Sequence, residues 1–157
     1  MGSSRAAGVL QRATADDGAL LARIHTQARA AAMPWLPVLH TLDETEGWMT
    51  NVVLPQQEVW LAQRDGAVLG FIALVPEWVE QLYVDPASWC CGAGSLLLDH
   101  AKQRHVSGFR LWTFQRNAMA RSFYRKHGLV EFRMTDGHDN EESEPDVLCG
   151  WKLAAEP

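Results

Sequence analysis

The sequence contains little cysteine and no long apolar run, and both absences exclude classes of protein. Its three cysteines, Cys90, Cys91 and Cys149, are odd in number and lack the two-residue gap of a zinc knuckle or a thioredoxin-like motif. A disulfide framework is therefore not expected, and a reducing cytoplasm is the compartment that this composition favours. No stretch approaches the roughly 20 consecutive apolar residues of a membrane-spanning helix, so we expect no membrane partner.

Positive charge is also scarce. The chain has 14 lysines and arginines against 19 aspartates and glutamates, which gives a net charge of −5. Nucleic-acid-binding domains need a large basic surface, so we expect no nucleic-acid partner. His100 and His105 are five residues apart, a spacing that places them on different sides of a helix, and we predict no metal site. The segment Met1–Leu10 lacks the charged start and long apolar run of a secretory signal.

The sequence does contain enough apolar material for one core. Hydrophobic residues make up 47% of the 157 residues, which predicts a single domain over residues 1–157. Apolar spacing and turn residues predict the order β-α-α-β-β-β-α-β-α-β-β, with a hairpin at Asp65-Gly66. Strands mixed with helices indicate an α/β (α+β) domain with a mixed central sheet. The expected strands are Val9–Ala13, Glu58–Arg64, Ala67–Val75, Val79–Val84, Phe109–Phe114, Val130–Met134 and Val147–Leu153. The expected helices are one that ends near Met33, then Thr41–Val53, Ala93–His105, and one that Asn117 caps and that runs to Lys126 or His127.

A glycine-rich turn is the first chemical signal. It joins the strand that ends at Val84 to the helix that begins near Ala93. Free N–H groups and the positive dipole end of a helix favour an anion such as a diphosphate. The spacing matches neither a Walker loop nor the dinucleotide-binding fingerprint, and a purely structural turn is the alternative. The residues of the turn are Trp89, Cys90, Cys91, Gly92, Ala93, Gly94 and Ser95.

A second signal lies on the helix that follows Asn117. The spacing of Asn117, Ala120, Phe123, Tyr124 and Gly128 fits the pattern Asn-x-x-Ala-x-x-Phe-Tyr-x-x-x-Gly-Phe. Together with the glycine-rich turn and the strand before it, this helix resembles the two central motifs of the GNAT superfamily of N-acetyltransferases. The two motifs stand in the order that the family requires, with a strand between them.

This resemblance implies a fold, a cosubstrate and a set of binding residues. The fold is a central mixed, mostly antiparallel sheet of about seven strands, flanked by helices and splayed between the fourth and fifth strands. The cosubstrate is acetyl-CoA, which an amine attacks directly in a ternary complex, and a homodimer is left open. The residues that the resemblance assigns to acetyl-CoA are Leu82, Tyr83, Val84, Trp89, Cys90, Cys91, Gly92, Ala93, Gly94, Ser95, Asn117, Ala120 and Tyr124.

The resemblance also implies two residues that move protons. Tyr124 would protonate the departing CoA thiolate, and Glu80 is the best candidate for the base that accepts the amine proton. A structural ion pair is an equal alternative for Glu80. Strand alternation predicts one shared face for Trp78, Glu80, Leu82 and Val84. The acceptor is a small-molecule or peptide amine, and the residues expected to help line its pocket are Trp35, His40, Trp78, Trp112, Gln115 and Arg116.

The turn departs from the family pattern at Trp89, where the family has Gln or Arg, and no cation lies in the turn. Weaker CoA binding is therefore expected unless Arg125 or Lys126 supplies the charge. The departure motivates an alternative function, a non-catalytic acyl-CoA-binding sensor or interaction module. The acidic run Asp136–Asp146 is expected either to attract a cationic amine or to form a solvated loop.

Overall fold

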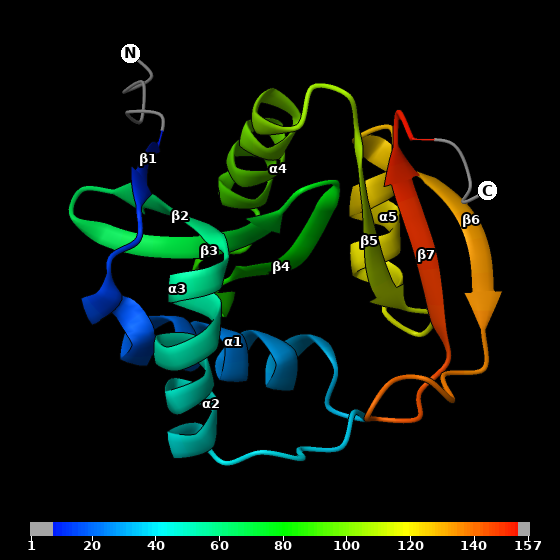
Figure 1. The fold of residues 1–157 in the computed structure, drawn as a ribbon, viewed down its shortest axis with the longest axis horizontal. Coiled ribbons are helices and arrows are strands. Elements are labelled where there is room, and N and C mark those ends of the chain that lie inside the picture. The colour runs from blue at the N-terminus through cyan, green and yellow to red at the C-terminus, as the bar shows by residue number, and fades with distance from the viewer. Residues whose placement is uncertain (1–7, 154–157) are drawn as a thin grey trace.

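The predicted order of strands and helices is confirmed in the computed structural model, which describes residues 8–153 (Figure 1). Residues 1–7 and 154–157 of the predicted domain, including most of Met1–Leu10, lie outside the described residues. The strands are β1 (Val9–Arg12), β2 (Glu58–Arg64), β3 (Ala67–Val75), β4 (Trp78–Val84), β5 (Phe109–Phe114), β6 (Val130–Thr135) and β7 (Asp146–Trp151). The helices are α1 (Gly18–Ala32), α2 (Leu42–Trp48), α3 (Leu54–Gln56), α4 (Ala93–Arg104) and α5 (Ala118–Lys126), with 3-10 turns at Ala15–Asp17 and Pro86–Ser88.

The predicted helix Thr41–Val53 is not uniform. It consists of α2, a π-helical turn over Met49–Val53, and the short α3. Pro55 has no N–H to donate to an α-helical hydrogen bond. The Leu54 amide just before it donates to the Met49 carbonyl, five residues back. The missing donor of Pro55 therefore coincides with a wider turn, and the helical segment continues beyond its predicted end.

The last strand is shorter than predicted. It ends at Trp151 rather than at Leu153. Lys152 has a φ of 64°, in the left-handed region, which interrupts the extended backbone that a strand needs.

The seven strands form one mixed sheet in the order β1-β2-β3-β4-β5-β7-β6. Neighbouring strands are antiparallel except for β4 and β5, which are parallel. Within residues 8–153, β4 and β5 share a single register pair, Trp78 with Arg110, and then diverge. Figure 1 shows β1–β4 and the β5-β7-β6 group as two halves of the sheet. The predicted mixed sheet, splayed between its fourth and fifth strands, is confirmed.

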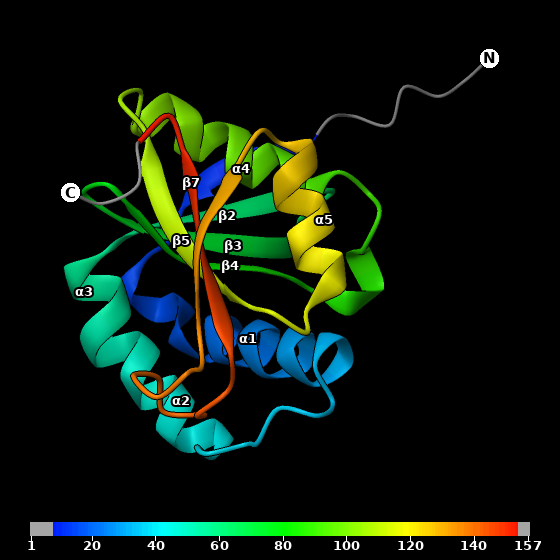
Figure 2. The same cartoon turned by 90° about the vertical axis from the view of Figure 1, so that its right-hand side faces the viewer.

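Helices cover both faces of the β1–β4 half, as the side view in Figure 2 shows. On one face, α1 and the π-helical turn contribute Leu21 and Met49 to a core cluster with Phe71 of β3. On the other face, α4 contributes Leu97 to a second cluster with Ile72 of the same strand. Because β3 supplies side chains to both clusters, it lies at the centre of the packing and fixes the position of its neighbour β4.

A β-bulge in β4 changes which of its side chains share a face. The register of β4 against β3 skips Glu80, so this residue is left without a partner on β3. Val79, before the bulge, therefore packs in the same core cluster as Leu82, after it. The prediction that Trp78, Glu80, Leu82 and Val84 share one face is therefore wrong. The bulge separates Trp78 from the face that holds Leu82 and Val84.

Gly70 in β3 allows a close approach to the end of β4. A Cβ atom at this position would lie 2.6 Å from the Tyr83 carbonyl oxygen and 3.0 Å from the Val84 Cα. We expect Gly70→Ala to lower the free energy of unfolding by about 1–3 kcal/mol, because the backbone must shift to make room. Urea unfolding measures the change, and an unaltered stability would contradict the prediction.

The matched control for this substitution is Gly47→Ala in α2. A Cβ atom on Gly47 would meet only the Asn51 side chain, at 4.0 Å. Because glycine destabilises the interior of a helix relative to alanine, this variant should gain up to about 1 kcal/mol.

Candidate active site

The divergence of β4 and β5 opens a cleft of about 1130 Å³. Its walls come from α1, β4, β5, α5, β6, the glycine-rich turn and the segment between β6 and β7. Elements that are far apart in the sequence therefore contribute to one concave surface. The lining residues that the sequence analysis also selected for cosubstrate binding or catalysis are Glu80, Leu82, Tyr83, Val84, Trp89, Cys90, Gly92, Ala93, Gly94, Ser95, Asn117, Ala120 and Tyr124.

The glycine-rich turn presents main-chain N–H groups to the cleft. Cys90 and Gly92 have left-handed backbones, with φ values of 65° and 89°, just before α4 begins. In the described part of the chain, no group accepts a hydrogen bond from the amides of Gly92, Ala93, Gly94 or Ser95. A Cβ atom on Gly92 would meet nothing within 4 Å, so the space beside it is open. Free amides at the positive end of the α4 dipole are suited to an anion.

Two side chains hold this turn in place. The Trp89 indole Nε1 donates a hydrogen bond to the Val84 carbonyl at 3.0 Å. From the other side, Arg64 Nη2 donates to the Cys91 carbonyl at 3.0 Å. Among the described residues, Cys91 is absent from the wall of the cleft, because it packs half-buried against the core cluster on the α4 side. The turn therefore faces the cleft with its main chain, and Cys91 faces the core.

Helix α5 brings the second motif to the cleft. Asn117 caps the helix, since its side-chain oxygen accepts a hydrogen bond from the Ala120 amide at 3.1 Å. The half-buried Tyr124 lines the cleft, and its hydroxyl makes no hydrogen bond within residues 8–153. Burial, reinforced by the nearby Tyr83 and Cys149, raises the pKa of the Tyr124 phenol above its usual value. The phenol therefore stays protonated at neutral pH and can act as a proton donor.

Strand β4 contributes a carboxylate and an unpaired amide. Glu80 lies exposed at the bulge and lines the cleft. Gln81, which the sequence analysis missed, also lines the cleft; it is only 8% exposed, and neither atom of its amide has a partner among the described residues. Buried amides are almost always hydrogen-bonded in native proteins, which marks Gln81 as a candidate ligand contact. The signal in the sequence was a polar residue in the middle of an apolar strand.

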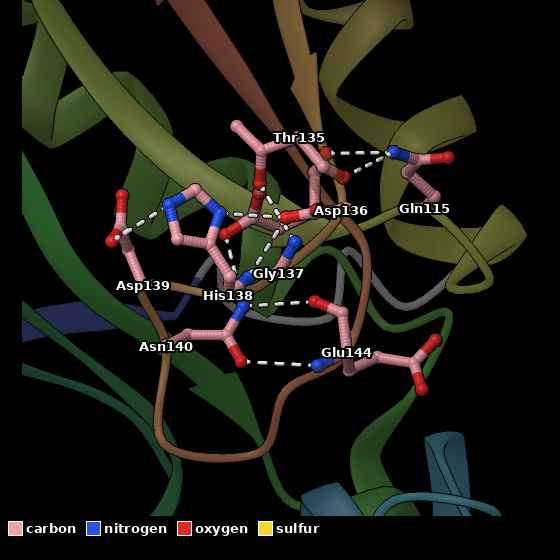
Figure 3. A network of polar contacts seen from close by, with 9 residues as sticks. Gln115, Thr135, Asp136, Gly137, His138, Asp139, Asn140 and Glu144 are labelled. Carbon is pink, nitrogen blue, oxygen red and sulfur yellow. Dashed lines mark hydrogen bonds and ion pairs between the residues drawn. The ribbon is translucent and has the colours of Figure 1, made fainter.

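The acidic run Asp136–Asp146, which ends at the first residue of β7, also reaches the cleft, through His138, Asp139, Asn140 and Asp146. Figure 3 shows the His138 ring between two carboxylates, 2.7 Å from Asp136 and 3.2 Å from Asp139. The hydrogen bond that the His138 ring donates to the Asp136 carboxylate, with the charge of Asp139, raises the pKa of His138. The segment is largely exposed to solvent, and it also places the carboxylates of Asp139 and Asp146 on the wall of the cleft.

Of the residues expected to help line the acceptor pocket, Trp112 lines the cleft. The others are absent from its wall in the described part of the chain. Arg116 illustrates why: it lies 4.0 Å from the centre of the Trp35 ring and 2.8 Å from the Glu144 carboxylate. Of the two basic residues expected to supply charge, Lys126 lines the cleft and Arg125 does not. The expected pocket residues that are absent from the wall are Trp35, His40, Trp78, Gln115 and Arg116.

The three cysteines are free thiols with different surroundings. Burial raises the pKa of the Cys149 thiol to about 11, so the reactive thiolate is scarce at neutral pH. Within residues 8–153, no cluster of three or more His, Cys, Asp or Glu side chains could hold a metal ion. In the same residues, every helix is too short or too polar to cross a bilayer.

Comparison with known proteins gives a family match and a fold match. Residues 55–131 match the model of the acetyltransferase (GNAT) domain. The solution structure of apo YjaB from Escherichia coli aligns with a TM-score of 0.77 and 22% identity, over 94% of this chain and 99% of that chain. A GCN5-related N-acetyltransferase from Rhodopseudomonas palustris, also described as a class-II aminotransferase, aligns with a TM-score of 0.78 and 18% identity, over 98% and 100% of the two chains.

A further solved structure contains coenzyme A. The PaiA N-acetyltransferase from Thermoplasma acidophilum, in complex with coenzyme A, aligns with a TM-score of 0.71 and 17% identity, over 93% of this chain and 99% of that chain. No curated protein sequence matches this chain. The predicted resemblance to the GNAT fold is confirmed by these comparisons.

The chain has two tyrosines, Tyr83 and Tyr124, so a difference titration isolates one of them. We expect the Tyr124 phenol to ionise above the usual pKa of about 10, because burial disfavours the phenolate. The near-ultraviolet absorbance of phenolate, measured against pH for the wild type and for Tyr124→Phe, gives the curve of Tyr124 by subtraction. Ionisation at or below the usual value would show that the phenol is as hydrated as free tyrosine.

Proposed function

We propose that this chain, which has the fold of the GNAT acetyltransferases and matches the GNAT domain model over residues 55–131, transfers the acetyl group of acetyl-CoA to a primary amine. The observation that carries this proposal is that unpaired amides at the start of α4 and the Tyr124 hydroxyl line the same cleft. The amides suit a diphosphate, and the phenol is a proton donor. Acetyl transfer from a CoA thioester can use both.

The residues of the cleft fit acetyl-CoA. The amides of Gly92–Ser95 would hold its diphosphate, and the absence of a side chain on Gly92 leaves room for the phosphates. Beyond the pair formed by Trp78 and Arg110, the β4 main-chain groups that face β5 have no strand partner in the described residues. Those of Leu82–Val84 would therefore pair with the amides of the pantetheine arm, and the bound thioester supplies the activated acetyl group.

The amine must be neutral to attack the thioester, and it must lose a proton during the transfer. We assign the role of the base that accepts this proton to Glu80. The carboxylate of Glu80, exposed at the bulge, accepts this proton directly or through water as nitrogen bonds to the carbonyl carbon. A main-chain N–H near Leu82 or Tyr83 donates to the oxyanion that develops. The carbon–sulfur bond then breaks, and Tyr124 gives its proton to the departing thiolate. Solvent returns a proton to Tyr124 after the products leave.

We propose further that the acceptor carries positive charge. Asp139, Asp146 and Glu80 contribute three carboxylates to the wall of the cleft, beside the basic residues Lys126, Arg133 and His138, and carboxylates that line a cleft attract a cationic ligand. The Asn140 amide donates to Asp146 at 3.1 Å and so orients that carboxylate. Gln81 has a free donor and a free acceptor for a polar group on the same ligand. Polyamines, aminoglycosides and peptide N-termini share this chemistry.

A screen of amines with detection of the CoA thiol tests the proposed function. We expect release of CoA thiol with at least one cationic amine. Tyr124→Phe should lower kcat by about 100-fold, the usual contribution of a general acid, while the dissociation constant of acetyl-CoA stays nearly the same. A variant with the wild-type rate at every pH would remove Tyr124 from the mechanism.

The second candidate function is a non-catalytic acyl-CoA-binding module. It is favoured by Trp89, whose ring nitrogen donates a hydrogen bond to the Val84 carbonyl and which brings no charge to the turn. A thermal shift with acetyl-CoA, measured beside the amine screen, separates the two functions. Stabilisation without thiol release on any amine favours the module, and the absence of stabilisation contradicts both functions.

The role of Glu80 is tested by Glu80→Gln, which keeps the shape of the side chain and removes the base. We expect kcat/KM for the best amine to fall by about 100-fold. The matched control is Glu77→Gln: the Glu77 side chain is 65% exposed and lies outside the cleft, so its rate should be that of the wild type. Equal rates for the two variants, measured as initial thiol release, would show that Glu80 is not the base.

A further inference from the structure

A guanidinium group lies directly behind the glycine-rich turn, which has no cation of its own. Arg64, the last residue of β2, precedes Cys91 by 27 residues in the chain, and its Nη2 donates to the Cys91 carbonyl at 3.0 Å. The Arg64 Nε is buried and has no hydrogen-bond partner among the described residues. Arg64 does not belong to the described wall of the cleft, so it contacts the turn from the side away from the cleft.

This hydrogen bond fixes the direction of one peptide unit. In a trans peptide the C=O and N–H bonds point in opposite directions, and the described chain contains no cis peptide bond. Because the Cys91 carbonyl points to Arg64, the Gly92 N–H of the same peptide unit points away from Arg64. Gly92 lines the cleft and Arg64 does not, so this N–H is directed to the cleft side.

The turn has little else to hold that peptide unit. Gly92 adopts positive and negative φ with similar ease, so its own conformation does not prevent rotation. Within residues 8–153, the Cys91 carbonyl accepts no hydrogen bond apart from the one that Arg64 donates. Loss of the guanidinium would therefore free the Cys91–Gly92 peptide to turn its amide away from a bound anion.

We infer that Arg64 is a positioning residue for the diphosphate of acetyl-CoA, an inference that rests on the proposed function. It holds the Cys91–Gly92 peptide with the amide toward the diphosphate. Its positive charge also lies behind the amides that the anion meets, where it adds to the field of the α4 dipole. Arg64 thus supplies from β2 the cation that is missing at Trp89.

A purely structural tie between β2 and the turn is the competing explanation for the Arg64 contact. If the contact is only a structural tie, loss of Arg64 lowers the stability of the protein and weakens the binding of every ligand of the cleft equally. A positioning role predicts a loss confined to ligands that carry the diphosphate. CoA and pantetheine separate the two roles, because pantetheine keeps the thiol arm and lacks the phosphates.

The test measures the dissociation constant of CoA by titration calorimetry and that of pantetheine by ligand-observed NMR, for the wild type and its variants. We expect Arg64→Ala to weaken CoA binding by about tenfold and to leave the dissociation constant of pantetheine within about twofold of the wild-type value. Arg64→Lys keeps a charge and a donor and should recover most of the loss. The matched control is Arg12→Ala on β1, whose guanidinium lies 5.7 Å from the centre of the Trp60 ring and does not touch the turn; its CoA affinity should equal that of the wild type.

Two results would overturn the inference: CoA affinity within about twofold of the wild type in Arg64→Ala, or an equal loss for CoA and pantetheine. If melting and circular dichroism show that Arg64→Ala does not fold, Arg64→Met keeps the aliphatic stem and is judged by the same two ratios. A wild-type protein that binds neither ligand contradicts the proposed function itself. That failure is distinct, because it is seen before any residue is changed.

Discussion

The parallel contact between β4 and β5, limited to the pair of Trp78 and Arg110, is the constraint on which the rest of the structure depends. Beyond this pair β4 keeps its ladder with β3 on one side and has no strand partner on the other in the described residues. Hydrogen-bonding groups of the main chain that would be used up inside a closed sheet are therefore available to a ligand. The glycine-rich turn follows the end of β4 and α5 follows the end of β5, so the divergence also brings both motifs to one cleft.

The anion side of the cleft relies on main-chain groups more than on charged side chains. The left-handed backbones of Cys90 and Gly92 reverse the chain so that the first amides of α4 face the cleft. Trp89 ties the turn to the end of β4, and Arg64 ties it to the end of β2. Charge from Arg64 acts through the peptide it holds, whereas Lys126 lies on the wall of the cleft itself. The geometry of the turn and its electrostatics are therefore coupled through a contact between the end of β2 and the turn.

The acceptor side has a different chemical character. The carboxylates on this side come from the bulge in β4 and from the acidic run Asp136–Asp146. Gln81 adds a buried side-chain amide that has no hydrogen-bond partner among the described residues. Within that acidic run, the exposed His138 ring is paired with the carboxylates of Asp136 and Asp139. The cleft therefore combines free amides of the turn with side chains of both charges, the basic ones being Lys126, Arg133 and His138. The free amides suit the phosphates of the proposed cosubstrate, and the carboxylates suit the proposed cationic acceptor.

The sequence by itself determined the order of the elements and the family resemblance, because capping residues, turn glycines and apolar spacing act over a few neighbouring positions. Asn117 and Gly92 could be recognised for that reason. Only the tertiary structure decided that Glu80 stands at a bulge, that Cys91 faces the core, that Trp35 and Arg116 pair with each other away from the cleft, and that Arg64 reaches the turn. Each of these depends on strand register or on contacts between residues far apart in the chain, and neither leaves a periodic signal in the sequence.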